Sequence, residues 1–183
     1  MSAKLNKYRL RNIINDMRLE MSRTLYRNLE GYAFKINATT DHIADRILDR
    51  TTHHTKAINA VNDLLNSMCD FHACNILHYA HKSFNEGKMQ NVVVYRKADH
   101  KIFAVPITIQ MFEDEFKSRL INITVRTMHP DYDAPVLAKN QKIHVNYKRP
   151  KIEFEYDGFR RVMSRLDKLI ISDECPDALK VLR

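Results

Sequence analysis

The spacing of apolar residues predicts that the first part of the chain is helical. Over the first thirty residues apolar side chains recur every three or four positions, with Arg or Lys between them, and Gly31 follows. This spacing is typical of one amphipathic helix that ends at a glycine. A short segment, Tyr32–Ile36, comes next, and Thr39 or Thr40 is the expected cap of a second helix.

The run from residue 56 to residue 84 predicts two more helices. It is too long and too evenly apolar for one surface helix, and we expect a bend near Asp70. After Gly87 the apolar period changes to two residues and β-branched side chains dominate, which predicts strands. The expected antiparallel strands are Asn91–Lys97, Ile102–Met111, Leu120–Met128 and Lys142–Tyr147, with Lys151–Tyr156 as a fifth strand or an extended connector.

The order of these elements predicts an α+β fold, with N-terminal helices packed on a small antiparallel sheet, and argues against a parallel doubly wound sheet. Beyond Gly158 an apolar stripe runs from Phe159 to Ile170 with arginines turned away from it, which predicts a docked C-terminal helix. A length of 183 residues fits one domain. We expect residues 1–130 to form its core and residues 131–183 to add an extension, a strand plus an amphipathic helix, packed on the same domain.

Composition narrows the function. Lys and Arg exceed Asp and Glu by eight, so the expected partner is polyanionic, with RNA or DNA ahead of an anionic membrane. Three glycines are too few for a P-loop or a dinucleotide fingerprint, which argues against ATP, GTP and NAD chemistry. Three cysteines without a framework spacing predict free thiols. No signal peptide is recognisable and no apolar run reaches the roughly 18 residues of a membrane span, so we expect a soluble, cytoplasmic protein without a membrane partner.

The strongest chemical signal is the nonapeptide His42-Ile-Ala-Asp-Arg46-Ile-Leu-Asp-Arg50. On a helix, His42, Arg46 and Arg50 lie within about 80° of one another, and the apolar residues lie on the other side. An imidazole beside guanidinium groups suits phosphodiester chemistry, because histidine can move a proton near neutral pH while arginine binds the phosphate. The alternative is a solvated helix face on which Asp45 and Asp49 pair with nearby arginines.

With its helices, this motif and a small sheet in order, the chain resembles the phage-encoded RegB-type endoribonucleases, which share the RelE toxin fold. Three parts carry the resemblance: the basic N-terminal helix, the nonapeptide, and the strand segment Ile121–Pro130, which contains Arg126 and His129. The resemblance implies cleavage of messenger RNA without a metal or other cofactor, by attack of the 2′-hydroxyl group that leaves a 2′,3′-cyclic phosphate. It also implies that His42 is a catalytic histidine, as base or acid, and that Arg46 binds the phosphate.

The second catalytic histidine of that family has no direct match. An ungapped alignment from Arg50 places Asn62 at its position, and an amide cannot relay a proton. With an insertion, His72 becomes the counterpart, because it follows an aromatic residue as the family histidine does. His129 is a further candidate at the end of the last shared strand, and Arg126 is expected to touch RNA.

A second constellation predicts a different chemistry. Cys74, His78 and His81 fall on one helical face, at a spacing that can hold a transition metal in a zinc-binding regulator. His72 or Cys69 lies close enough in sequence to complete such a site. No CxxC pair or HExxH motif accompanies them, so we expect no metal and interpret them as partly buried polar residues at a helix edge.

Cations at strand ends predict a path for single-stranded RNA, and an aromatic ring beside them can stack on a base. The alternative is that they are solubilising side chains that protect exposed strand edges. The candidate RNA-binding residues are Tyr95, Arg96, Lys97, Lys101, Lys117 and Arg119.

The sequence therefore predicts an enzyme, a metal-independent endoribonuclease that cleaves single-stranded messenger RNA in the cytoplasm of a host bacterium, with the ribosome as a further partner. Two alternatives stay open. One is a non-enzymatic RNA-binding regulator that keeps the scaffold without proton transfer at Asn62. The other is a phage effector whose basic surface binds a host nuclease or the ribosome.

Overall fold

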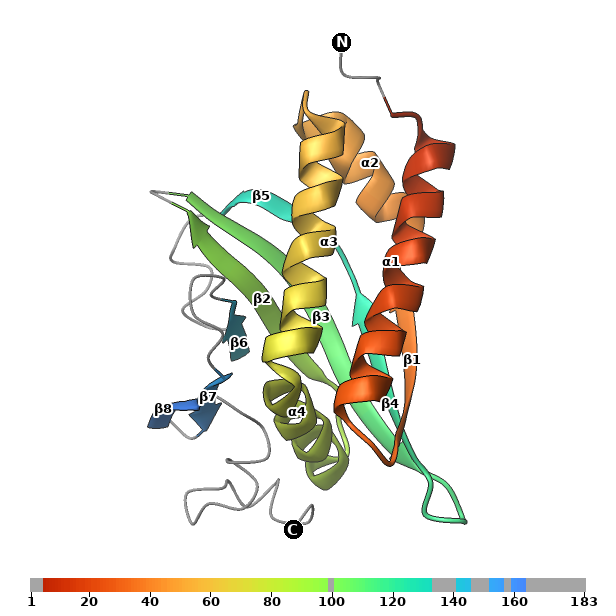
Figure 1. Cartoon of the computed structure of the whole chain (residues 1–183), viewed down its shortest axis with the longest axis vertical. Coiled ribbons are helices and arrows are strands. Elements are labelled where there is room, and N and C mark those ends of the chain that lie inside the picture. The colour runs from red at the N-terminus through yellow and green to blue at the C-terminus, as the bar shows by residue number, and fades with distance from the viewer. Residues whose placement is uncertain (1–4, 99–100, 133–140, 146–151, 157–158, 164–183) are drawn as a thin grey trace.

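The computed structural model of the chain describes residues 5–98, 101–132, 141–145, 152–156 and 159–163 (Figure 1). The expected N-terminal helices are confirmed, and the break between the last two of them falls at His72, close to the predicted bend. None of the helices in these residues combines the length and the apolar composition needed to cross a bilayer. They are α1 (Lys7–Asn28), α2 (Thr40–Arg50), α3 (His54–Phe71) and α4 (Ala73–Glu86).

Local side chains explain where two of these helices begin and end. The side chain of Asn6 caps α1, because its Oδ1 accepts a hydrogen bond from the N–H of Arg9 (2.9 Å). Gly87 ends α4 in the left-handed conformation (φ 65°), which a glycine adopts without steric cost. The chain then turns from the helices into the strands at the point where the apolar period changes.

Six strands of the described residues form one sheet: β1 (Tyr32–Ala38), β2 (Gln90–Ala98), β3 (Lys101–Glu113), β4 (Arg119–Val125), β5 (His129–Tyr132) and β6 (Gln141–His144). The strand order is β1-β4-β3-β2-β6, and β5 pairs with β3. The expected antiparallel pairing is confirmed for β2 with β3 and for β3 with β4. The expectation of a purely antiparallel sheet is wrong, because β6 runs parallel to β2, and β1, for which no strand was predicted, runs parallel to β4. The sheet is therefore mixed.

The segment after β4 also differs from the expectation. The pattern predicts one strand that extends to Met128 and a loop after Pro130. The structure instead ends β4 at Val125 and forms β5, which pairs with the opening residues of β3, including His129 opposite Ala104. Pro130 is compatible with an edge strand, because a residue there can lack an N–H without the loss of a hydrogen bond between strands. This short strand places His129 beside the sheet.

The C-terminal extension contains a hairpin where we expected a helix. β7 (Ile152–Tyr156) pairs antiparallel with β8 (Phe159–Met163). The predicted helix is therefore wrong over residues 159–163, and its remainder lies outside the described residues, as do residues 171–183. The sequence contains a contrary signal, since Asp157-Gly158 is a dipeptide typical of a two-residue hairpin turn.

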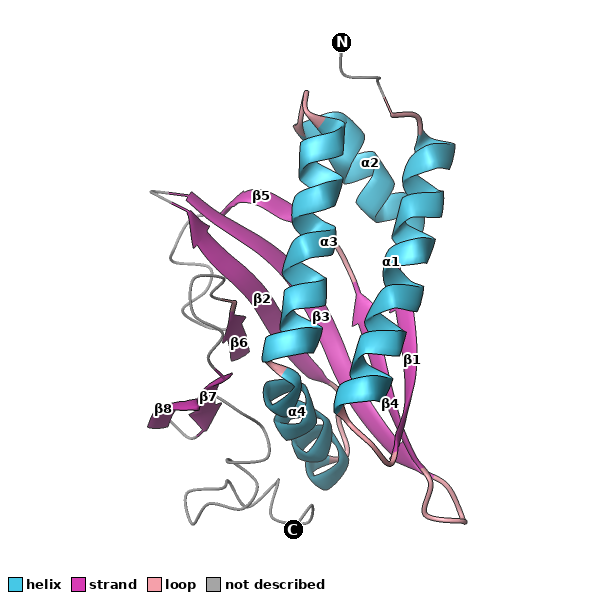
Figure 2. Cartoon of the chain, in the orientation of Figure 1, coloured by secondary structure: helices cyan, strands magenta, loops and turns pink. Residues whose placement is uncertain are grey.

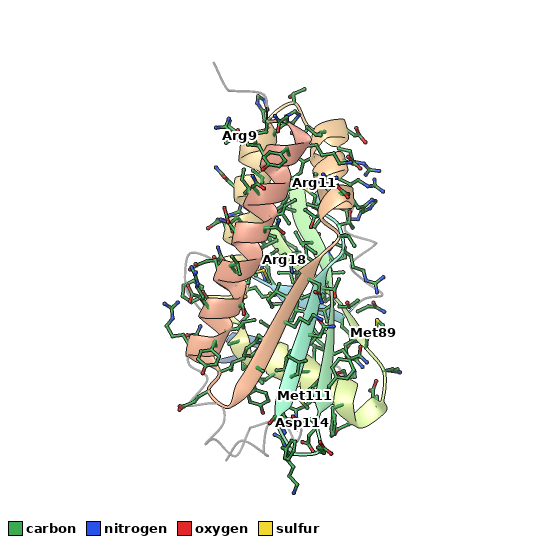
Figure 3. All side chains as sticks on the ribbon, turned by 90° about the vertical axis from the view of Figure 1, so that its right-hand side faces the viewer. Arg9, Arg11, Arg18, Met89, Met111 and Asp114 are labelled. Atoms are coloured by element: carbon green, nitrogen blue, oxygen red, sulfur yellow. The ribbon has the colours of Figure 1, made fainter. Side chains whose placement is uncertain are left out.

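The helices α1, α2 and α3 lie on one face of the sheet (Figure 2). Alternate residues of β4, Ile121, Ile123 and Val125, are fully buried, and so is the inward stripe of α1 from Leu10 to Leu25. Each fully buried aliphatic side chain stabilises the fold by roughly 1.5–3 kcal/mol. Seen from the side, α1 packs along β1 (Figure 3). This core fixes the ends of β1 and β4, where the candidate site is built.

Candidate active site

The carboxyl ends of β1 and β4 lie side by side, because the two strands are parallel and their last residues, Ala38 and Val125, are register partners. α2 begins directly after β1, and the segment that leads to β5 begins directly after β4. The N–H of Thr39 donates to the carbonyl of Val125 across this junction (3.0 Å). Two segments that are far apart in the sequence thus meet at one edge of the sheet.

This junction brings His129 close to two residues of the nonapeptide. Burial lowers the pKa of His129 below its ordinary value, and the charges of Arg46 and then His42 lower it further. Groups that alter the pKa of a histidine in this way lie near its ring, since charge interactions fade with distance in water. The structure therefore joins three of the predicted residues, from α2 and β5, in one place.

The faces of α2 are as the spacing predicts. Ile43, Ala44 and Ile47 are buried against the core, whereas His42 is exposed and Arg46 is half-buried. The imidazole of His42 is therefore open to solvent beside a cation. Arg50, the last residue of α2, is also exposed, but it lies two turns further along the helix, about 12 Å from His42.

Two carboxylates of α2, Asp41 and Asp45, pair with cations of α1. Lys7 Nζ lies 2.6 Å from Asp45 Oδ1, and the guanidinium of Arg11 is paired with Asp41. Figure 3 shows Arg11 between the two helices. Asp45 therefore pairs with a lysine of α1, and not with an arginine of α2 as in the alternative interpretation. These ion pairs neutralise two negative charges next to His42 and hold α2 against α1.

Arg126 lies on the opposite face of the sheet from the helices. It is exposed, and its Nη2 donates to the sulfur of Met89 (3.6 Å), which places the guanidinium over that face and towards the start of β2. We call this side of β1, β2, β3, β4 and β6 the polar face. On β2 and the start of β3 it is buried, at Val93, Tyr95 and Ala104. Its described positions include no Asp or Glu, and its polar side chains that are at least partly exposed include Lys35, Asn37, Gln110, Asn122 and Thr124.

The structure does not bring His72 to this site. His72 is fully buried at the junction of α3 and α4. The 18 residues of α3 separate it from the turn that follows α2. That helix is about 27 Å long. Asn62, the residue aligned with the family's second histidine, accepts a hydrogen bond from Asn66 one turn later in α3 (3.0 Å). Of the candidates for a second imidazole, His129 is the one beside His42.

The predicted RNA-binding residues do not form one path. Tyr95 is only 7 % exposed and its ring stacks on His144 (centroids 4.8 Å apart), so it is not presented to a base. Arg96 pairs with Asp63 of α3 (3.6 Å), and Lys97 is exposed at the end of β2. Lys101 begins β3, but its side chain lies outside the described residues.

The remaining two cations lie at the other end of the sheet. Lys117 is exposed in the turn between β3 and β4, and Arg119 begins β4. β3 has 13 residues, so this turn is about 40 Å from Lys101. Arg119 donates a hydrogen bond to Glu113 (3.1 Å), and this bond raises the pKa of its guanidinium. The described cations of this set therefore lie at opposite ends of the sheet.

The alternative metal cluster is occupied by other contacts. Tyr32 Oη and His81 Nε2 are 2.9 Å apart and share a hydrogen bond, and burial lowers the pKa of His81 to about 4. Burial also raises the pKa of the Cys69 thiol, which disfavours the thiolate that a metal requires. Within the described part of the chain, no group of three or more His, Cys, Asp or Glu side chains could hold a metal ion.

Two features of the site were missed by the sequence reasoning. Thr39 was expected only as a helix cap, and the polar positions of β1, Lys35 and Asn37, carried no prediction. The alternation of polar and apolar residues from Tyr32 to Ala38 is a strand signal that could have identified the latter pair. No family model, curated protein or solved structure matches the chain.

Proposed function

We propose that the protein is a metal-independent endoribonuclease that cleaves single-stranded RNA, with messenger RNA as its substrate class. The observation that carries this proposal is the hydrogen-bonded junction of Thr39 with Val125 and Arg126, which brings together the segments that lead to His42 and His129. Cleavage by a 2′-hydroxyl group needs a base for that group, an acid for the leaving oxygen and a cation for the added charge of the transition state. Two imidazoles and one guanidinium supply these three functions.

The lowered pKa of His129 assigns the roles. A lowered pKa favours the unprotonated imidazole, so we assign His129 as the group that accepts the proton of the 2′-hydroxyl group. The 2′-oxygen forms a bond to phosphorus while the bond from phosphorus to the 5′-oxygen breaks, and His42 donates a proton to the leaving 5′-oxygen. Arg46 binds the phosphate oxygens as their negative charge grows. The products are a 2′,3′-cyclic phosphate and a 5′-hydroxyl end.

The polar face supports a single-stranded nucleic acid as the substrate. β1 and β4 both run from this face to the site, since Lys35 and Asn37 precede His42 and Asn122 and Thr124 precede His129. Amide and hydroxyl groups can form hydrogen bonds with the edges of unpaired bases. Cations without neighbouring carboxylates attract the phosphates of the RNA backbone. An RNA strand on the polar face has its phosphates near Arg126 and leads to the two histidines.

The same surface favours a second candidate, an RNA-binding regulator that does not cleave. The polar face needs neither histidine to hold RNA, and Asn62 replaces the second histidine of the family that the chain resembles. The two candidates differ in one measurable property, the appearance of new RNA ends.

The first prediction is cleavage of a short single-stranded RNA in the presence of EDTA. The products should carry 2′,3′-cyclic phosphate ends, identified by mass spectrometry. His42→Ala and His129→Ala should each lower the cleavage rate at least about 100-fold, the usual contribution of a general acid or base, while the Kd for RNA changes less than about threefold. His53→Ala, which removes an exposed histidine before α3, is the matched control and should keep the activity.

The outcomes separate the candidates. Binding without cleavage by the unaltered protein favours the regulator. Cleavage that requires a divalent metal rejects the two-histidine mechanism. Full activity in His129→Ala removes the basis of the proposal, because the mechanism then lacks its base.

A further inference from the structure

Thr39 lies between the two segments that form the candidate site. It follows Ala38, the last residue of β1, and precedes Thr40, the first residue of α2. Its backbone (φ −76°, ψ 70°) leaves the extended conformation, so the ladder between β1 and β4 stops here. The last backbone bond across the junction is the one from the N–H of Thr39 to the carbonyl of Val125 (3.0 Å).

The hydroxyl group of Thr39 extends this pairing by one residue. It donates a hydrogen bond to the carbonyl of Arg126, on the segment that leads to His129. The N–H of Arg126 donates in the opposite direction, to the carbonyl of Pro106 in β3 (3.0 Å). The peptide groups of Arg126 are therefore held between β3 and Thr39, although Arg126 lies outside β4.

This use of the hydroxyl group is not the usual one for its position. A threonine directly before a helix normally accepts a hydrogen bond from an N–H of the first turn. α2 has no such side-chain bond. The hydroxyl group of Thr39 thus connects α2 to the strand segment and does not cap α2.

We propose that Thr39 is a positioning residue that holds the start of α2 against the segment after β4 and so sets the separation of His42 and His129. Each histidine follows one end of this hydrogen bond by three residues, so loss of the bond allows the two histidines to move apart. The catalytic part of this inference rests on the proposed function. The positioning part does not, because it concerns the distance between two side chains in the free protein.

The test compares three variants. Thr39→Val keeps the β-branched shape and removes the donor, whereas Thr39→Ser keeps the donor. Thr40→Val is the matched control, because it removes a neighbouring hydroxyl group whose hydrogen bond goes to Ala38, within the same segment (3.3 Å). The measurements are NMR titration of the His42 and His129 rings, single-turnover cleavage, and RNA binding.

Thr39→Val should lower kcat about tenfold with Kd for RNA within about twofold, because displacement of reacting groups weakens the chemical step more than binding. The pKa of His129 should move towards its ordinary value of about 6.5 as Arg46 and His42 recede. Thr39→Ser and Thr40→Val should behave like the unaltered protein. A hydroxyl group that only stabilised the fold would shift the melting temperature without moving this titration.

An unchanged His129 titration in folded Thr39→Val overturns the inference. The titration needs no cleavage, so an unaltered protein that does not cut RNA refutes the proposed function while the NMR result still decides the role of Thr39. If far-UV circular dichroism shows that Thr39→Val does not fold, Thr39→Cys replaces it. Its thiol is a weaker donor, and a titration equal to that of the unaltered protein overturns the inference in the same way.

Discussion

At the scale of single residues, the site depends on where β4 ends. Ile121, Ile123 and Val125 alternate into the core, and a strand that continued to residue 129 would turn His129 inward with them. The structure ends β4 at Val125 and pairs His129 with Ala104 instead, leaving the ring partly exposed. The sequence indicated His129 as a candidate, but its orientation depends on a backbone change that apolar spacing does not encode.

Arg46 should contribute more to the reaction than to binding. Its half-buried guanidinium lies near His129, where the transition state of the proposed reaction would gain negative charge. Arg46→Ala should lower kcat about 100-fold, the typical effect of losing one donor to a developing oxyanion, and weaken RNA binding less than about fivefold. Arg50→Ala, on the same face two turns away, is the control for lost charge. Equal losses of kcat and affinity in Arg46→Ala would reduce Arg46 to a binding residue.

Two buried histidines should make the fold sensitive to acid. Burial lowers the pKa of His78 and of His81 to about 4, and the neighbouring charges of Lys82 and Arg119 respectively contribute. The unfolded chain, in which histidine titrates near 6.5, binds protons first as the pH falls. The free energy of unfolding should therefore decrease between about pH 6.5 and pH 4 and then lose this dependence. A pKa that differs by one between the folded and unfolded chain corresponds to about 1.4 kcal/mol, so the two histidines together account for a loss of several kcal/mol.

Urea denaturation at several pH values measures this loss. His81→Gln keeps a polar partner for the hydroxyl group of Tyr32 and removes one titrating group, so the dependence on pH should become about half as steep. His53→Gln, at an exposed position, should leave the slope unchanged. A slope in His81→Gln as steep as in the unaltered protein would contradict the assignment.

At the scale of elements, periodicity predicted most helices and strands but not how they pair. The 3.6-residue spacing gave α1 to α4, and the two-residue spacing gave β2, β3 and β4. The parallel pairing of β1 with β4 joins segments about 87 residues apart, and no local pattern specifies that contact. The hairpin of β7 and β8 was missed because the stripe from Phe159 fits a helix as well, although Asp157-Gly158 favours a turn.

The same limit explains which part of the site could be predicted. His42 and Arg46 share one helix, so their relation follows from helical geometry alone. His129 joins them only through the register of β1 and β4, and His72 is excluded only by its burial. The relative placement of residues on one element could therefore be predicted from the sequence, whereas the positions of His72 and His129 relative to α2 required the fold.

At the scale of the whole molecule, positive charge is placed on the polar face away from the core helices. Lys35 on β1 and Lys142 on β6 lie on this face, and Arg126 lies between them. Their separation across the sheet is suited to several phosphates of one strand. This arrangement predicts that RNA affinity depends on residues from both sides of the sheet.

Lys35→Glu and Lys142→Glu should each weaken RNA binding about three- to tenfold and reduce the salt dependence of binding by about one counterion. Both effects are measured by fluorescence anisotropy in the His42→Ala background. Salt is varied from roughly 50 to 200 mM, so that the slope of log Kd against log salt concentration can be determined. Lys117→Glu, in the turn between β3 and β4, is the matched control and should retain affinity and slope. An equal loss in Lys117→Glu would indicate a general effect of net charge.

The parallel pairing of β1 and β4 also has a consequence during synthesis of the chain. A nascent chain that has emerged only as far as α4 already contains His42 and Arg46, but it lacks the strand that β1 joins and the imidazole that completes the set. On the proposed mechanism, the chain therefore acquires its second imidazole only late in translation, after residue 129 has left the ribosome. A fragment that stops before β4 is then expected to leave RNA uncut.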